Sequence, residues 1–205
     1  YENANRDAAQ DGSNPQRITF DTDGNVAASH DIVFYIDGNL WINNFPTFSF
    51  ALAPTVDGTR VTFAVSGNIY IGDNLFYGNQ TKDGIALIAL KDPAVPDSGN
   101  VYFGDPQAGT LNHMFGFMYA ENNFYDYNLS TAASAVVNLT GTMSAGNQVL
   151  IERDFQSQHT RLNVNYDPRL EAGELIMPGL PGITGGGGAV QYQIQTWIRD
   201  RGANN

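Results

Sequence analysis

A chain of 205 residues with 42% hydrophobic and only 15% charged residues is long enough for one domain and too apolar to be disordered. Its net charge of −11 would repel a phosphate backbone, and no apolar run reaches the ~20 residues of a membrane span. We therefore expect no nucleic-acid partner and no direct membrane insertion by this chain. Cysteine is absent, which excludes disulfides, thiolate metal sites and a cysteine nucleophile.

The pattern along the chain predicts an all-β protein. Residues 1–16 are polar and aperiodic, typical of a linker or a frayed start. The segments that follow are short, rich in Val, Ile, Phe, Tyr and Thr, and separated by Gly, Asn, Asp or Pro, and no window shows a helical stripe over three turns. The predicted strands cover 17–20, 32–36, 39–42, 47–52, 60–65, 68–71, 75–77, 85–90, 101–103, 115–119, 124–127, 136–139, 148–152 and 162–164.

One local arrangement recurs, namely an apolar run, a two-residue corner and a second apolar run. It occurs as IVFYI-DG-NLWI, VTFAV-SG-NIYI and VVNL-TG-TMSA, and less regularly as GIALIAL-KD and FGFMYA-EN-NFYDY. The corners recur at roughly 20–30 residues, which is the length of one solenoid coil. This spacing favours a right-handed parallel β-solenoid (β-helix) over the alternative, an antiparallel sandwich.

The hydrophobic pattern also favours the solenoid, since residues 85–90 are continuously apolar, as in a strand covered on both faces. Residues 91–99 and 104–112 carry Pro, Gly and Asp and predict protruding loops. Four glycines at 185–188 precede an alternating segment at 190–198, which predicts a last strand that caps the solenoid or joins a sheet edge. We divide the chain into an N-terminal linker (1–16), a β-solenoid (17–165) and a C-terminal Pro/Gly-rich lead with a capping strand (166–205).

The run GNIYIGDNLFYGNQTKDGIALIALKD, the YDPRL motif and a Pro/Gly-rich stretch that closes on QTWIRD carry a family resemblance. Together they resemble the β-helix domains of type IV pilus-associated proteins, including minor pilins that bear a solenoid, and related surface domains of unknown function. The resemblance extends from about Ile32 to Asp200. It implies an extracellular parallel β-helix without catalytic residues.

Two groups of residues are candidates for binding. Asp21, Asp23 and Asn25 place oxygen ligands at alternate positions, as in half of a calcium loop, although an ordinary Asp/Gly turn explains them as well. Calcium is therefore the one cofactor we consider. Tyr125 and Tyr127 lie in the polar run NNFYDYN, where exposed rings would stack on a sugar or dock a protein partner, although aromatic side chains also stack inside solenoid cores.

Catalytic motifs are missing from the sequence. His30, His113 and His159 are far apart, and there is neither an HExxH nor a GxSxG motif. A polysaccharide-cleaving β-helix would need carboxylates that converge near an arginine. The candidates for such a group are Asp73, Asp83, Asp92 and Asp105, with Arg60 nearby, and most of them sit in turn sequences that favour Asp for geometry alone.

The sequence therefore favours a non-enzymatic structural or adhesive module of a pilus-like or cell-surface appendage. Its partners would be other appendage subunits or surface glycans. Two alternatives stay open: a carbohydrate-binding or polysaccharide-cleaving β-helix, and a filament subunit that assembles through its ends or terminal strands.

Overall fold

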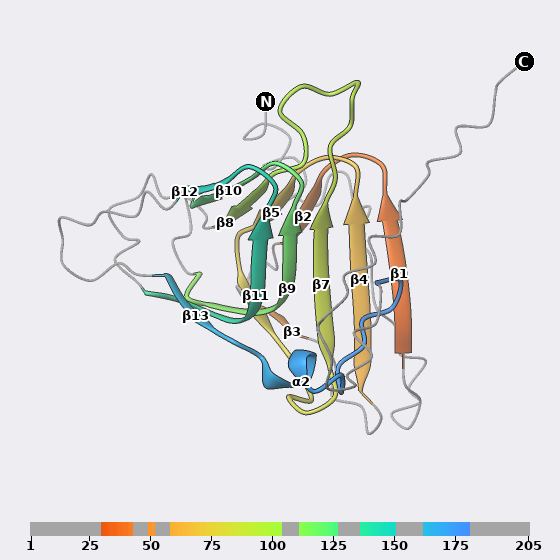
Figure 1. Ribbon diagram of the computed structural model, residues 1–205, viewed down its shortest axis with the longest axis vertical. Coiled ribbons are helices and arrows are strands. Elements are labelled where there is room, and N and C mark those ends of the chain that lie inside the picture. Colours follow the sequence, from red (N-terminus) through yellow and green to blue (C-terminus); the bar gives the residue numbers. More distant parts are fainter. Residues whose placement is uncertain are drawn as a thin grey trace, which may run out of the picture.

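The computed structural model describes residues 30–42, 49–51, 58–103, 111–126, 136–150 and 162–180. In these ranges the chain forms a β-solenoid of about four turns with almost no helix (Figure 1). Every strand pairing among the described residues is parallel. The predicted all-β solenoid is confirmed. Its right-handedness and its C-terminal capping strand stay predictions, and residues 190–198 lie outside the described residues.

The longest strands form a six-stranded sheet, here the first sheet, in the order β1-β4-β7-β9-β11-β13. Each strand pairs with the equivalent strand of the neighbouring turn, so the sheet runs along the length of the solenoid. The strands are β1 (His30–Ile36), β4 (Thr59–Val65), β7 (Gly84–Ala89), β9 (His113–Ala120), β11 (Val137–Ala145) and β13 (Leu162–Asn165).

Shorter strands form the other walls of the solenoid. The second sheet has the order β12-β10-β8-β5-β2, and a third sheet pairs β3 with β6. All of these strands begin within the predicted segments or one residue from them. They are β2 (Leu40–Ile42), β3 (Ser49–Ala51), β5 (Ile69–Ile71), β6 (Asn74–Phe76), β8 (Val101–Phe103), β10 (Asn123–Asp126) and β12 (Gln148–Leu150).

An asparagine marks each corner between the first and second sheets. The corners predicted at residues 37–38, 66–67 and 121–122 are confirmed, because each connects a first-sheet strand to a second-sheet strand. Successive corner asparagines are 29, 32, 23 and 24 residues apart, close to the predicted repeat. They are Asn39, Asn68, Asn100, Asn123 and Asn147.

Two predicted corners are misplaced. Residues 91–92 open a loop instead, and the corner of that turn follows at Asn100. Thr140 and Gly141 lie inside the continuous strand β11. Gly141 is in register with Gly116 of β9, both have φ of +144°, and a Cβ at residue 141 would lie 1.9 Å from the Gly116 oxygen. Glycine is therefore needed here for close backbone approach, which in sequence looks like a corner.

Like side chains stack in rows inside the solenoid. One row runs across the first sheet in register, and its two phenylalanine rings stack with centroids 5.3 Å apart. Such rows bury apolar area at every turn, so the core extends along the whole described length. This row consists of Phe34, Phe63, Leu87, Met118 and Met143.

The outer face of β7 is covered as well, which confirms the two-sided burial expected there. Residues 166–180, here called the return segment, include the short helix α2 (Pro168–Glu171) and double back from β13 over the first sheet. Ala86 of β7 forms a separate small core with Leu175 and Met177. The return segment therefore supplies the second cover that the apolar run required.

The predicted loop at residues 91–99 projects from the end of β7 (Figure 1). The Ser98 hydroxyl donates to the Val95 oxygen at 2.8 Å and accepts from the Asp92 N–H at 2.8 Å, while the Val95 side chain is 48% exposed. The loop is thus held by its own hydrogen bonds. For the second predicted loop, residues 104–110 lie outside the described residues. Within the described ranges, no helix has the length and apolar character needed to traverse a bilayer.

Candidate functional site

Aromatic side chains form a row on the outer face of the second sheet. Trp41, Tyr70, Tyr102 and Tyr125 occupy equivalent positions on four successive strands, and the residues that precede the three tyrosines are buried in the core. Successive ring centroids are 5.1, 4.9 and 5.0 Å apart, and the planes differ by 10°, 8° and 17°. We call these four residues the aromatic row. Their spacing is that of the hydrogen-bonded strands, so the backbone sets the stacking distance.

The stacking decides which surfaces of the row can meet a ligand. Tyr70 and Tyr102 have an aromatic neighbour against both ring faces. Their ring edges stay partly exposed, and the Tyr125 hydroxyl accepts a hydrogen bond of 2.9 Å from Asn123. A sugar ring that stacks on aromatic faces therefore has no room between the stacked rings, and at Tyr70 and Tyr102 only the ring edges remain for contact.

The candidate ligand residue Tyr125 is thus the end of an aromatic row, and Tyr127 lies outside the described residues. Sequence reasoning did not recognise the row, although a signal for it exists. Each member follows a corner asparagine by two residues, as Asn-x-Trp or Asn-x-Tyr. Alternation in a strand places that residue on the outer face in every turn.

The corner asparagines form a second row beside the aromatic one. The Oδ1 atom of Asn39 accepts the Asn68 N–H at 2.8 Å, and the same bond repeats one turn higher at 3.0 Å and again at 3.1 Å. At the next turn Asn147 donates its side-chain amide to Asn123 at 2.8 Å. Because the inner members are buried, these bonds satisfy polar groups that would otherwise be costly, and they join consecutive turns.

The return segment carries the one ion pair between well-buried side chains among the described residues. Arg169 donates to Asp167 through Nη2 at 2.7 Å and through Nε at 3.0 Å, and the two side chains are 12% and 5% exposed. The same guanidinium donates to the Asp83 backbone oxygen at 3.0 Å and lies 5.2 Å from the centre of the Tyr77 ring. Arg169 therefore joins α2 to the turn that precedes β7.

Burial and this ion pair shift three pKa values. Burial raises the pKa of Tyr77 to about 12. Burial also acts to raise the pKa of Asp167, but the hydrogen bonds and charge of Arg169 outweigh it, so that pKa lies below its usual 3.8. The pKa of Arg169 is raised, because Asp167 outweighs the opposite effect of burial. All three groups keep their ordinary charge at neutral pH, which suits a structural tie.

Among the described residues, the carboxylates considered for sugar chemistry do not gather in one group. Asp73 and Asp83 are fully buried. Asp83 accepts hydrogen bonds from the backbone N–H groups of Thr59 at 2.7 Å and Asn79 at 2.6 Å, which gives it a role in closing the turn before β7. Asp105 lies outside the described residues.

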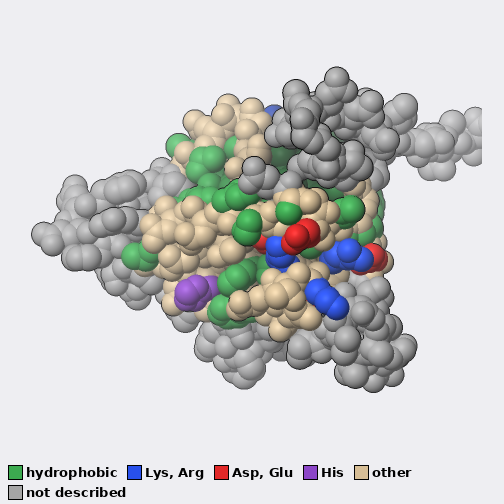
Figure 2. All heavy atoms as spheres, turned by 60° about the horizontal axis from the view of Figure 1, so that its bottom comes forward, with side chains coloured by type: hydrophobic (Ala, Val, Ile, Leu, Met, Phe, Trp, Pro, Cys, Tyr) green, Lys and Arg blue, Asp and Glu red, His purple; other side chains and the backbone are tan. Residues whose placement is uncertain are grey.

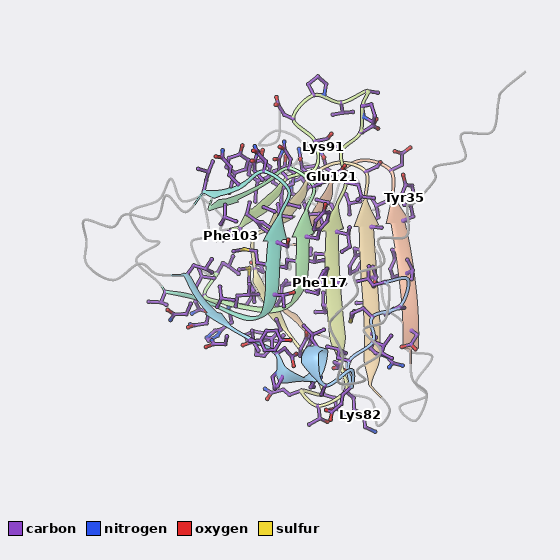
Figure 3. All side chains as sticks on the ribbon, in the orientation of Figure 1. Tyr35, Lys82, Lys91, Phe103, Phe117 and Glu121 are labelled. Carbon is purple, nitrogen blue, oxygen red and sulfur yellow. The ribbon has the colours of Figure 1, made fainter. Side chains whose placement is uncertain are left out.

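Of the other members, Asp92 is distant from Asp83, whereas the backbone of Arg60 is in register with Gly84 beside it. Asp83 precedes β7 and Asp92 follows it, so the two residues lie beyond opposite ends of this strand. Figure 3 shows their chain neighbours, Lys82 and Lys91, near opposite ends of the molecule. Arg60 pairs with Asp31 on the outer face of the first sheet at 2.6 Å. Seen from the lower end, acidic and basic side chains lie next to one another among hydrophobic ones (Figure 2).

The calcium candidates Asp21, Asp23 and Asn25 lie outside the described residues. Within the part of the chain that the structure describes, no three His, Cys, Asp or Glu side chains are placed to hold a metal ion. Of the histidines, the structure describes the side chain of His113, whose ring lies 5.8 Å from that of Phe76.

Fold and site together define the class of this protein, a parallel β-solenoid with an outer aromatic row and a return segment that ties its turns together. No protein-family model, curated protein or solved structure gives a significant match to the chain. The comparisons therefore add no link to type IV pilus proteins.

Proposed function

We propose that the protein is a non-enzymatic structural and adhesive module of an extracellular appendage, in which the solenoid is a stiff spacer between other subunits. The observation that carries this proposal is the continuity of its rows. The asparagine row and the aromatic row each link every turn they touch to the next one. The backbone hydrogen bonds of the parallel strands also link each turn to the next. Backbone hydrogen bonds, asparagine side chains and stacked rings therefore all resist separation of the turns.

The described ionisable side chains that are buried make structural contacts, which favours this role over catalysis. Asp83 closes a turn through backbone hydrogen bonds, and Asp167, Arg169 and Tyr77 hold the return segment. Each of these groups contributes to cohesion, and the proposed role needs no cofactor. The sequence resemblance favours a type IV pilus as the appendage, with other pilus or surface subunits as partners.

One observation favours a second candidate, carbohydrate binding, namely the partly exposed ring edges of the aromatic row. Polysaccharides that run along the row would receive hydrogen bonds from its edges, not stacking on its inner faces. A glycan array with the wild type and with Tyr102→Leu tests this candidate. Loss of a glycan signal in a variant that keeps its circular dichroism would favour it over the spacer role.

The spacer role is tested in the organism that produces the protein. Cells that lack the gene are complemented with the wild type, with Asn100→Ala or with Asn147→Ala, and appendages are counted by electron microscopy while adhesion is measured. We expect deletion to reduce both the number of appendages and adhesion. Complementation with Asn147→Ala should restore both, whereas Asn100→Ala, which breaks the asparagine row at its centre, should restore them poorly. Unchanged appendages and adhesion after deletion would refute the role.

A further inference from the structure

The aromatic row consists of tryptophan and tyrosine alone. Its rings are nearly parallel, and successive centroids are 5.1, 4.9 and 5.0 Å apart. Indole and phenol rings lose a single electron to chemical oxidants readily, whereas a phenylalanine ring resists such oxidation. Electron transfer between two rings slows steeply with distance and is fast between rings in direct contact. The row therefore has the composition and the spacing of a path for electrons.

A continuous row of oxidisable rings is not a general feature of this solenoid. On the first sheet, one register that starts with a tyrosine continues with an alanine and an isoleucine before the next tyrosine. Three strand spacings, ~14 Å, separate these two phenol rings. The positions in this register are Tyr35, Ala64, Ile88, Tyr119 and Ser144. Continuity is therefore a property of the aromatic row itself.

Electron transfer in the aromatic row has a direction. At neutral pH an indole radical is a stronger oxidant than a tyrosyl radical, so Tyr70 gives an electron to an oxidised Trp41 and not the reverse. The Trp41 Nε1 is buried, with no hydrogen-bond partner among the described residues. An indole radical that keeps the proton on this nitrogen is a stronger oxidant still, which favours the same direction.

The row also has a defined far end. Tyr125 is its last aromatic member, and the next position in register is Leu150 of β12, whose side chain is not oxidised in this way. The Tyr125 residue is partly exposed. A soluble reductant can therefore approach the ring at which the path ends.

We propose that the aromatic row repairs an oxidised Trp41 by passing electrons to it from the tyrosines. A one-electron oxidant, such as a peroxyl or carbonate radical, takes one electron from Trp41. Tyr70 returns an electron to the indole and releases its phenolic proton to water, which leaves a neutral tyrosyl radical. The radical moves to the next tyrosine when an electron and a proton pass the opposite way. At Tyr125 a thiol gives back a hydrogen atom and is itself left as a thiyl radical. This inference does not depend on the proposed role in an appendage.

Pulse radiolysis of the full chain tests the proposal. The azide radical oxidises indole selectively at neutral pH, and the absorption bands of the two amino-acid radicals are followed in time. Every protein carries Trp197→Phe, because the sequence has two tryptophans and Trp197 lies outside the described residues. We expect the tryptophanyl band to convert into the tyrosyl band at a rate independent of protein concentration. A rate proportional to protein concentration, or no tyrosyl band, would overturn the proposal.

Two tyrosine variants test whether the electron follows the row. Tyr70→Phe keeps an aromatic ring in the stack but removes the phenol next to Trp41. The next phenol, Tyr102, is two strand spacings or ~10 Å away, so we expect transfer to be at least tenfold slower. Tyr35→Phe removes an exposed phenol outside the row and should leave the rate unchanged. Both variants are measured where circular dichroism shows them folded. An unchanged rate in Tyr70→Phe would refute the path.

The end of the path has a readout of its own. A nitroso spin trap forms covalent adducts with tyrosyl radicals, and peptide mass spectrometry locates the modified residues. We expect the adduct at Tyr125 when the row is intact, and at Tyr102 or Tyr70 in Tyr125→Phe. Adducts confined to tyrosines outside the row would contradict the proposal.

Discussion

The ion pair between Asp167 and Arg169 makes the stability of the protein depend on pH. The pKa of Asp167 is lower in the folded protein than its usual 3.8, so its stabilisation is fully present above pH ~4 and is lost as the pH falls through the folded value. Asp167→Ala also strands the buried guanidinium and removes the N-cap acceptor of α2, so we expect a loss of about 3 kcal/mol at pH 7. Urea unfolding measures this loss.

The control for the charge itself is Asp167→Asn, which keeps an N-cap acceptor and removes the carboxylate. We expect the difference in unfolding free energy between wild type and Asp167→Asn to shrink when urea titrations are repeated at decreasing pH below about 4. A difference that stayed constant down to pH 2 would show that the charge of Asp167 contributes nothing.

Alanine substitutions at Gly38 and Gly141 distinguish the cost of backbone strain from the cost of a steric clash with a neighbouring strand. Both have positive φ, +144° and +125°, but a Cβ at residue 141 would meet the Gly116 backbone, whereas one at residue 38 has nothing within 4 Å. We expect Gly38→Ala to cost about 1–2 kcal/mol and Gly141→Ala at least ~2 kcal/mol more, by urea unfolding. Equal costs would mean that β9 and β11 move apart freely.

At the scale of the strand and its corner, position in the asparagine row sets the importance of each amide. Asn100 is buried, donates to Asn68 and to the Asp97 oxygen, and accepts from Asn123. Asn100→Ala leaves several buried groups unpaired, so we expect a loss of about 3 kcal/mol. The exposed Asn147 makes one side-chain bond at the end of the row, and Asn147→Ala should cost under ~1 kcal/mol in the same urea assay. A similar cost for both would refute cooperation along the row.

The strands were predictable because their residues favour one conformation locally. Val, Ile and aromatic residues between Gly and Asn corners located β2, β4 and β5 to within one residue, and β1 to within two. The continuous apolar run of β7 even indicated a second cover for that strand. Gly141 misled the prediction, because a glycine required by a neighbouring backbone is indistinguishable in sequence from a glycine at a corner.

The site was harder to predict because its contacts join distant residues. Arg169 donates a hydrogen bond to the backbone oxygen of Asp83, 86 positions earlier. No periodic pattern in the sequence indicates where the chain doubles back over the first sheet. Asp167-Pro168 is an N-cap followed by a first-turn proline, so α2 itself carried a recognisable signal. The aromatic row carried one in its repeated Asn-x-aromatic spacing.

At the scale of the whole molecule, the return segment adds a second connection between turns that the strand ladders already pair. A chain that ends at residue 165 loses the burial of Leu175 and Met177 against β7, which is worth about 4 kcal/mol. We expect its melting temperature to fall by roughly 10 °C and its fluorescence with a hydrophobic dye to rise. A chain that ends at residue 180 keeps these contacts and should bind less dye. Equal melting temperatures for the two chains would contradict this function of the return segment.

The return segment also has a consequence for biogenesis. Pro178 follows its partner Thr62 by 116 residues, so during synthesis β4 and β7 are complete long before their outer cover has left the ribosome. For that interval a nascent chain displays an apolar sheet face next to open strand edges, the combination most prone to self-association. A chaperone or export factor that engages this face until the C-terminal side emerges would therefore raise the yield of native protein more than it would for a solenoid whose turns are complete one by one.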